Sequence, residues 1–171
     1  MKKFFNWVLI LGACVGAFYL IGLIVPRNQT QASKTTLQAK PAELFAVVSD
    51  PTTWSNWNPD VSAISERSSR DHKMWSVTDK HARTYDLEVV LEEEPLSWQA
   101  TYTIEGTRFV LHFDFKWYGE GSLARVTKTF DTSDTWLRAK RFLLPTPEAS
   151  SVALLNALCQ QVGEPGTAKE N

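Results

Sequence analysis

The sequence contains few of the residues that usually hold a metal ion or form a disulfide. Its two cysteines are Cys14, in an apolar N-terminal run, and Cys159, in the last predicted helix, so we expect no internal disulfide. The histidines His72, His81 and His112 are not spaced as metal ligands, and no cysteine stands beside them. These residues therefore predict no metal site, and they leave the redox compartment open.

An excess of one charge is also absent. The 171 residues include 18 basic and 19 acidic side chains, which gives a net charge of −1. Proteins that bind nucleic acids usually present a basic face, so we expect no nucleic-acid partner. A hydrophobic content of 43% in a chain of this length is enough for one core.

Catalytic motifs are missing as well. The sequence has no nucleophile elbow, zinc-protease helix, phosphate loop or dinucleotide-binding run. Gly119 and Gly121 have the spacing of a hairpin turn, and the acidic run 92–94 is expected to be solvated. His112 falls on the polar side of its predicted strand, which favours a solvent-facing histidine over a catalytic base. We therefore predict no catalytic residue and no cofactor.

Charge is absent again from residues 4–25, which form one long apolar run. As a helix, this run would extend roughly 33 Å, and the hydrocarbon core of a bilayer is about 30 Å thick. A secretory signal has a shorter apolar region followed by a small-x-small cleavage site, and no such site follows Val25. Residues 1–25 are therefore predicted to form an uncleaved, single-pass membrane anchor.

The residues that flank this run predict its orientation. Lys2 and Lys3 precede it, and Arg27 follows it closely. The positive-inside rule then places the N-terminus in the cytoplasm and the folded domain outside. Residues 26–34 are polar and unpatterned, and we predict that they form a linker.

A second interpretation of the N-terminus is a bacterial lipoprotein signal. Leu11-Gly12-Ala13-Cys14 has the form of such a signal, which ends at the cysteine to be lipidated. Cleavage there would leave residues 15–25 as another bare apolar run, so the uncleaved anchor is favoured. Both interpretations attach the chain to a membrane.

A short strand and two short helices are predicted over residues 34–59. Residues 35–37 suit a strand, and Pro41 is tolerated at the first position of a helix. That helix has a narrow apolar stripe formed by Leu44, Phe45, Val47 and Val48. After a break at residues 50–51, a second short helix is predicted to end at Trp57.

An antiparallel sheet and one helix are predicted for the rest of the chain. Apolar and polar residues alternate in four neighbouring runs after residue 82, and the three short turns between these runs carry proline or glycine. The predicted strands are 61–67, 73–78, 83–94, 98–105, 108–118 and 123–132. Residues 147–162 have the spacing of an amphipathic helix that ends at Gly163, and residues 164–171 are predicted to be a frayed polar tail.

Three sequence segments resemble the START-like (SRPBCC) superfamily, which includes polyketide cyclase/dehydrase-like domains. They are Pro41-Ala42-Glu43-Leu44-Phe45, Val48-Ser49-Asp50-Pro51 and Trp54-Ser55-Asn56-Trp57-Asn58-Pro59. Glu94-Pro95-Leu96 matches the family's hairpin in part, and Gly121-Ser122-Leu123 stands where the family usually has Gly-Thr. The resemblance implies an α+β helix-grip domain over residues 35–163, with an antiparallel sheet wrapped around a long C-terminal helix.

The resemblance also implies an internal cavity beneath that helix. Ligand cavities are mostly apolar with a few polar tips, which tyrosine and tryptophan combine in one side chain. Core packing is the preferred role of Phe45, Phe109 and Leu111, and Trp54 is expected to clamp the short helices to the sheet. Six other aromatic residues are predicted to line the cavity: Trp57, Tyr85, Tyr102, Phe113, Phe115 and Trp117.

Basic residues stand beside apolar ones just before the last helix. Arg138, Lys140 and Arg141 are followed by the apolar run 142–144. Such a segment can contact an anionic bilayer surface. A solvated turn that covers the mouth of the cavity is the preferred prediction.

Together these features predict a membrane-anchored START-like domain that binds a hydrophobic small molecule or lipid without covalent chemistry. One alternative is a polyketide cyclase/dehydrase-like enzyme, in which the pocket mainly positions a reactive substrate. Another is a ligand-free protein-interaction module, which a solid core would favour.

Overall fold

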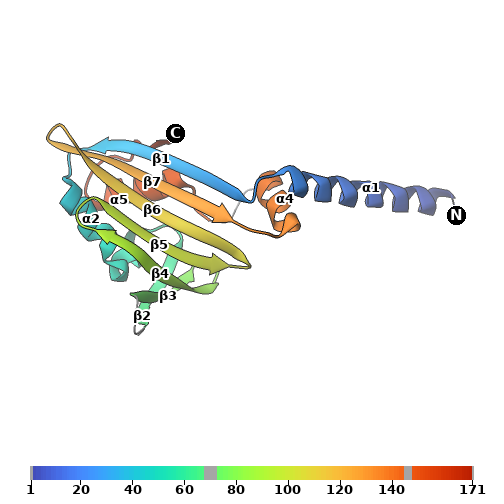
Figure 1. Cartoon of the computed structure of the whole chain (residues 1–171), viewed down its shortest axis with the longest axis horizontal. Helices are drawn as coiled ribbons and strands as arrows, with labels where there is room; N and C mark the ends of the chain where they lie inside the picture. The colour runs from blue at the N-terminus through green and yellow to red at the C-terminus, as the bar shows by residue number, and fades with distance from the viewer. Residues whose placement is uncertain (1, 68–72, 145–147, 171) are drawn as a thin grey trace.

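A single long helix projects from one end of a small α+β domain (Figure 1). The computed structural model describes residues 2–67, 73–144 and 148–170. The projecting helix, α1 (Lys2–Ile24), contains a 19-residue segment, Asn6–Ile24, that is long and apolar enough to cross a membrane. A signal sequence meets the same criterion. Most of this segment is exposed, in contrast to the core helix of a soluble protein.

The domain is built on one antiparallel sheet of eight strands in the order β2-β3-β4-β5-β6-β7-β1-β8. The strands are β1 (Asn28–Leu37), β2 (Val61–Arg67), β3 (Met74–Asp79), β4 (Thr84–Glu93), β5 (Ser97–Ile104), β6 (Thr107–Tyr118), β7 (Gly121–Asp131) and β8 (Lys169–Glu170). The six strands predicted between residues 61 and 132 are confirmed. Side chains alternate between buried and exposed along β6 and β7, as the sequence pattern predicts.

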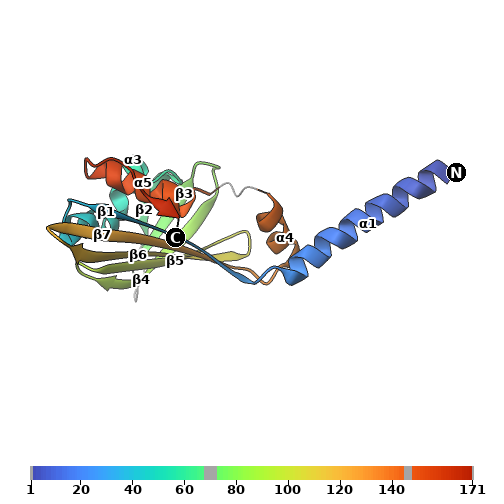
Figure 2. The same cartoon turned by 90° about the horizontal axis from the view of Figure 1, so that it is seen from above.

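Helices cover one face of this sheet (Figure 2). They are α2 (Pro41–Ser49), the 3-10 helix η1 (Pro51–Thr53), α3 (Trp54–Trp57) and α5 (Ser151–Gln161). The predicted α+β helix-grip fold is confirmed, with α5 packed against β1 and β7. The Ser150 side chain caps α5 by accepting a hydrogen bond from the Ala153 N–H, and Pro147, the predicted first residue, lies outside the described residues.

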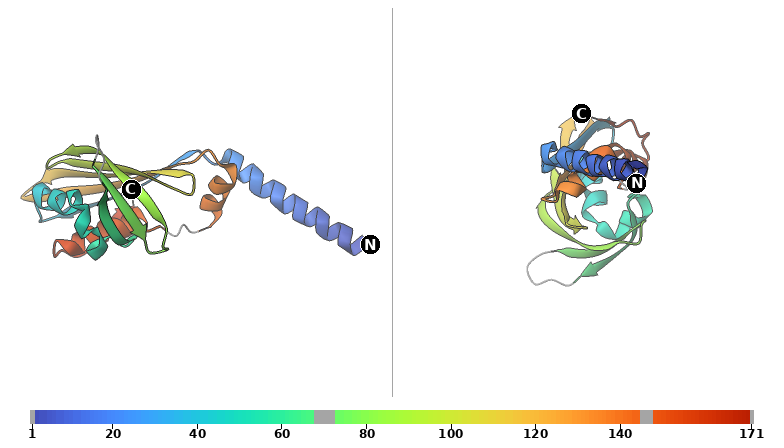
Figure 3. Two further views of the ribbon diagram at one scale, coloured as in Figure 1. Left: turned by 90° about the horizontal axis from the view of Figure 1, so that it is seen from below. Right: turned by 90° about the vertical axis from the view of Figure 1, so that its right-hand side faces the viewer.

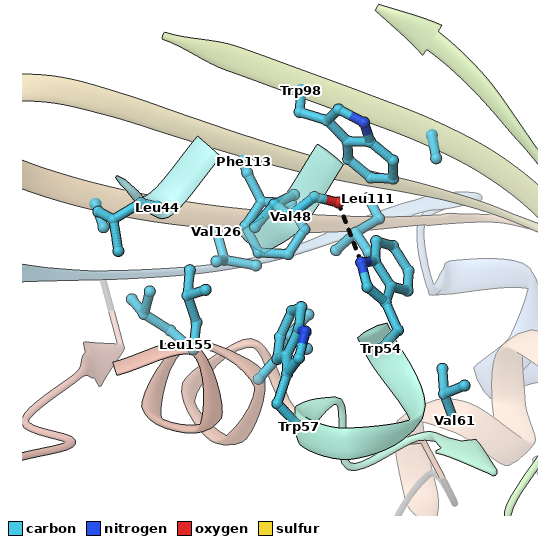
Figure 4. Close-up of a cluster of buried hydrophobic side chains, with 14 of the residues drawn as sticks. Leu44, Val48, Trp54, Trp57, Val61, Trp98, Leu111, Phe113, Val126 and Leu155 are labelled. Atoms are coloured by element: carbon cyan, nitrogen blue, oxygen red, sulfur yellow. Dashed lines mark hydrogen bonds between the residues drawn. The ribbon is translucent and has the colours of Figure 1, made fainter. Parts of the chain in front are cut away.

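A solid aromatic cluster fills the space between these helices and the sheet (Figure 4). The Trp54 side chain is 1% exposed, and its indole N–H donates a hydrogen bond to the Val48 carbonyl over 3.1 Å. Its ring meets Trp98 edge-on at 5.2 Å and Trp57 at 5.9 Å. Trp54 therefore clamps α2 and α3 to the sheet, as the sequence predicts.

The predicted linker over residues 26–34 is wrong, because β1 begins at Asn28. This strand pairs with β7 along its whole length, from Asn28 opposite Asp131 to Leu37 opposite Ser122. Its inward residues are small and polar, and Ser33 shares a 2.7 Å hydrogen bond with Ser151 of α5. The segment resembles a linker in the sequence because these hydroxyl groups, rather than apolar side chains, face the helix.

The C-terminal tail is also ordered, contrary to the prediction of a frayed end. Lys169 and Glu170 form β8 beside β1, and the Thr167 hydroxyl shares a 3.0 Å hydrogen bond with Thr35. The Glu164 carboxylate accepts hydrogen bonds from two backbone N–H groups at the end of β1, those of Gln38 and Ala39. The tail therefore fastens the edge of the sheet.

The segment from Arg138 to Leu144, predicted as a solvated turn, lies mostly in an α-helix. Helix α4 (Thr135–Leu143) begins after Asp134, whose carboxylate accepts hydrogen bonds from the N–H groups of Trp136 and Leu137. An aspartate at this position stabilises a helix by satisfying donors in its first turn. This capping signal at Asp134 could have revealed the helix in the sequence.

Helix α4 packs against the last turns of α1 (Figure 3). The Phe18 and Trp136 rings stack at 4.9 Å, and the Arg138 guanidinium donates a hydrogen bond to the Val25 carbonyl over 3.2 Å. A Cβ atom placed on Gly22 would lie 2.0 Å from the Thr135 carbonyl oxygen. Only glycine allows so close an approach of the two backbones.

The antiparallel register brings one set of strand ends to the base of α1. Asn28 at the start of β1 pairs with Asp131 at the end of β7, which also pairs with Arg108 near the start of β6. Ile104 and Thr107 close the β5–β6 hairpin at the same edge. We call this end of the sheet, where the strands terminate near α1, the junction end, because β1 follows α1 there. The opposite end, which holds the β6–β7 hairpin, is the far end.

We predict that Gly22→Leu separates α4 from α1. The added side chain would collide with the Thr135 carbonyl, so α4 should open more often. Amide hydrogen exchange of α4 in the full chain should then rise roughly tenfold, which corresponds to about 1.4 kcal/mol of local stability. Gly16→Leu is the matched control, because no atom lies within 4 Å of a Cβ at that position. Equal exchange in the two variants would contradict this packing.

Candidate functional site

A cavity of about 240 Å³ lies at the junction end of the sheet. Its walls come from the α3–β2 connection, the β3–β4 turn, the ends of β4 and β5, and the residues before α5. They are Pro59, Asp60, Asp79, Lys80, His81, Arg83, Tyr85, Tyr102, Ile104, Glu148 and Ala149. The cavity therefore combines an aromatic wall with an unusual number of charged groups.

The aromatic wall belongs to a row of stacked rings that crosses four strands. Tyr85 of β4 stacks on Tyr102 of β5 at 4.8 Å, and Tyr102 stacks on Phe109 of β6 at 4.8 Å. Phe109 then meets Phe130 of β7 edge-on at 5.3 Å. Cross-strand aromatic pairs of this kind stabilise a sheet and make one wall rigid.

The two tyrosines of this row keep their protons and can donate hydrogen bonds. Burial raises the pKa of both hydroxyls, and the nearby Asp60 carboxylate raises it further. Among the described residues, neither hydroxyl has a hydrogen-bond partner. Each can therefore offer a neutral O–H to a polar atom in the cavity.

The β3–β4 turn contributes a buried carboxylate with three fixed partners. Asp79 accepts hydrogen bonds from the backbone N–H groups of His81 and Arg83, and from Arg83 Nε over 2.7 Å. Burial by itself would raise the pKa of Asp79, but the hydrogen bonds from Arg83 and His81 outweigh burial and lower it. Asp79 therefore stays ionised and holds the Arg83 guanidinium beside the cavity.

Two further carboxylates connect the sheet to the segment before α5. Asp60 accepts a hydrogen bond from the buried Lys128 ammonium over 3.2 Å and another from the Ala149 N–H over 2.6 Å. Glu148 pairs with Arg83 at 3.2 Å and with Arg141 of α4 at 3.4 Å. The same Arg141 lies over the Phe109 ring at 4.9 Å. These ion pairs join α4, α5 and the sheet around the cavity.

The six aromatic residues predicted to line a cavity divide into three groups. Tyr85 and Tyr102 line the one found here. Trp57, Phe113 and Phe115 are buried in the solid cluster under α2, α3 and α5. Trp117 lies on β6 near the far end and is 58% exposed. The structure therefore brings together only two of the six.

The sequence pattern did not predict that charged side chains line the cavity. Asp60 follows the Trp57-Asn58-Pro59 segment directly, but nothing in its spacing links it to Lys128 or Glu148. Lys128 does stand on the inward parity of β7, where a charged residue among apolar neighbours is a signal for a buried partner. That signal was available, although the identity of the partner was not.

A serine, a histidine and an aspartate also meet on the outer face of the sheet. His112 Nε2 lies 2.8 Å from the Ser97 hydroxyl and 3.3 Å from Asp114. A catalytic triad needs the serine and the carboxylate on opposite nitrogens of the ring, and here one nitrogen serves both. This group therefore lacks the geometry of a triad. Within the described residues, no three histidine, cysteine or acidic side chains gather as a metal site.

We predict that Asp79→Asn destabilises the protein by about 2 kcal/mol at pH 7, since it removes a charged hydrogen bond between the buried Asp79 carboxylate and the half-buried Arg83 guanidinium. The folded-state pKa of Asp79 lies below its unfolded-state value of about 3.9. Its stabilising effect is therefore complete above about pH 4 and disappears as the pH falls through the folded-state pKa. Urea unfolding of the full chain in detergent should show the variant and the parent converging at acidic pH.

Asp86→Asn is the control for this measurement. Asp86 pairs with Arg67 on the surface, and exposed pairs contribute roughly 0–1 kcal/mol. The role assigned to Asp79 would be refuted if both variants lost the same stability, or if the difference for Asp79→Asn persisted unchanged below pH 3.

Solved structures with the same fold include several START-like proteins. The Zhui aromatase/cyclase from Streptomyces sp. R1128 is 14% identical, with a TM-score of 0.65 over 80% of this chain and 94% of that one. A START superfamily protein from Mycobacterium smegmatis is 13% identical, with a TM-score of 0.57 over 78% of this chain and 97% of that one. At these identities, the likeness establishes the fold alone.

The chain spans about half the length of two di-domain aromatase/cyclases that it also matches, 44% of one and 52% of the other. The second is StfQ from the steffimycin biosynthetic pathway, at 12% identity and a TM-score of 0.61 over 80% of this chain. A comparison with curated proteins finds no match. The family model described as "Polyketide cyclase / dehydrase and lipid transport" matches residues 29–145. This match covers more than half of the sequence, and the chain therefore belongs to that family, within the START-like superfamily.

Proposed function

We propose that this protein is a membrane-anchored START-like domain that binds a small amphipathic or lipid-like molecule in the junction-end cavity. The observation that carries the proposal is the composition of the cavity wall. Tyr85, Tyr102 and Ile104 offer apolar surface, and two neutral hydroxyls stand among fixed charges. This combination of an apolar wall and a few oriented polar groups is typical of small-molecule sites.

The size of the cavity limits what it can hold. A volume of about 240 Å³ is slightly below the range of roughly 300–1,000 Å³ that is usual for pockets of drug-sized ligands. We infer that it holds a small molecule, or one end of a longer lipid whose remainder extends outward. An apolar body would lie against the tyrosine rings, and an acceptor atom would take a hydrogen bond from a tyrosine O–H.

The packing of α1 supports the membrane anchor. An exposed apolar helix in water is unfavourable, and a bilayer would solvate the segment Asn6–Ile24. Gly22 and Val25 are buried against the domain, so the end of α1 is part of the folded structure. A signal sequence that is cleaved would not need such contacts, and we therefore propose that α1 is retained.

Binding without catalysis is the simpler proposal for this cavity. The carboxylates at its wall are ion-paired, Asp79 with Arg83, Asp60 with Lys128, and Glu148 with both Arg83 and Arg141. A general acid or base needs a pKa near the working pH, whereas the pKa of Asp79 is lowered. The core beneath α5 is solid, where the resemblance implied a cavity, so the separate junction-end cavity is what supports ligand binding over an interaction module.

We predict that the full chain, purified in detergent, carries one apolar molecule and that Ile104→Trp abolishes this binding. Ile104 is 5% exposed and lines the cavity, so a larger side chain should fill the ligand's space. Native mass spectrometry should show an added mass on the parent but none on the variant. Solvent extraction of the parent would then identify the molecule.

Trp117→Ala is the matched control for this experiment. Trp117 is aromatic but lies near the far end of the sheet, so its removal should leave the added mass unchanged. An unfolding measurement would show that Ile104→Trp is folded. A bare mass for the parent after incubation with phospholipids and fatty acids, or the same added mass on folded Ile104→Trp, would overturn the proposal.

We also propose that the domain lies outside the cytoplasm, because Lys2 and Lys3 precede the apolar segment Asn6–Ile24 and only Arg27 follows it closely. We predict that a cysteine at position 117, in a Cys14→Ala background, reacts with a membrane-impermeant maleimide in intact cells. Exposure of Trp117 makes this position accessible, and buried Cys159 should remain unlabelled. Labelling only after the cells are broken would place the domain in the cytoplasm.

A further inference from the structure

Helix α4 presents apolar side chains that the described chain leaves about half exposed or more. Its buried side consists of Arg138 and Ala139. Trp136 is 46% exposed, Phe142 65%, and the two residues that follow Phe142 are 46% and 53% exposed. We call this surface the α4 face: Trp136, Lys140, Phe142, Leu143 and Leu144.

We propose that the α4 face docks on the surface of the lipid bilayer that α1 crosses. This inference rests on the proposed membrane anchor and adds a second contact with the same membrane. Continuity with α1 identifies the bilayer as the occupant. Trp136 packs on Phe18 and Tyr19, so the α4 face continues the exposed surface of α1 (Figures 2 and 3).

The contact with α1 also fixes the depth of α4. Phe18 lies six residues before the end of α1, or about 9 Å along its axis. Arg138 contacts α1 at Val25, just past the segment Asn6–Ile24, and Trp136 contacts it deeper, at Phe18. Helix α4 therefore lies across the boundary between the hydrocarbon core and the interfacial layer when Asn6–Ile24 spans that core. Tryptophan and phenylalanine are favoured at that depth.

The charge of α4 fits this location. The helix contains three basic residues and no acidic one. Arg138 and Arg141 turn inward, to the Val25 carbonyl and to Glu148, which leaves Lys140 exposed beside the apolar side chains. One exposed cation adds only a modest attraction to anionic lipid, so apolar contact would provide most of the binding.

Docking of α4 would hold the cavity next to the membrane. Arg141 of α4 pairs with Glu148, and Glu148 lines the cavity. The cavity is therefore one side chain away from the helix that contacts lipid.

The test uses the full chain in vesicles of phosphatidylcholine with phosphatidylglycerol. The fluorophore NBD is attached to one cysteine at a time, and doxyl-labelled lipids quench it on contact. Phe142→Cys and Leu144→Cys, each in a Cys14→Ala background, report on the α4 face. Trp117→Cys in the same background is a far-end control of similar exposure, and native Cys14 reports on α1.

We expect blue-shifted, quenched emission at Cys14 and at both α4 positions, and unquenched emission at position 117. Quenching at Cys14 without quenching at either α4 position would overturn the docking of α4 but leave the anchor intact. Blue-shifted but unquenched emission on α4 would also overturn it, since another protein surface would then cover the helix. Absence of quenching at Cys14 would overturn the anchor, and this inference with it.

Discussion

The arrangement at the junction end depends on the need to pair buried charges. Lys128 is 1% exposed on the inner side of β7, and an ammonium in that position is tolerated only beside an anion. Asp60 supplies the negative charge and also accepts the Ala149 N–H just before α5. One ion pair therefore fixes the connection that precedes β2 and the start of the last helix. Glu148 directly precedes Ala149 and pairs with Arg141, so a second ion pair joins α4 to the same connection.

Strands β4 to β7 could be predicted from the sequence because apolar and polar residues alternate along them and Pro95, Gly106 and Gly119 mark the turns between them. Residues 28–34 of β1 escaped prediction as a strand because Ser33, the one buried side chain among them, is polar and gives no hydrophobic period. Helix α4 escaped for a different reason. Its apolar and basic residues are adjacent in sequence, and its stability comes from the Asp134 cap and from packing on α1. The pairing of β1 with β7 and the packing of α4 on α1 join segments about 100 residues apart, which local patterns do not show, whereas the Asp134 cap is a local signal.

The candidate site was predictable only where parity decides which way a side chain points. Tyr85 and Tyr102 fall on the inner face of their strands, and both line the cavity. Parity does not show where along a strand the packed core gives way to empty space, so Phe113 and Phe115 could not be told from cavity residues. Trp117 continues the inner parity of β6, but it lies beyond the helices that cover the sheet, in the last turn before the far-end hairpin.

The short join between α1 and β1 has a mechanical consequence. Only Val25, Pro26 and Arg27 separate the helix from the strand, and the Val25 and Arg27 carbonyls accept hydrogen bonds from Arg138 and Thr132. Such a join transmits torque, whereas a flexible linker would absorb it. A transmembrane helix tilts when the bilayer thins. If α1 spans the membrane, the domain should therefore rotate with it as one lever, and local bilayer thickness would set the angle at which the cavity meets the lipid.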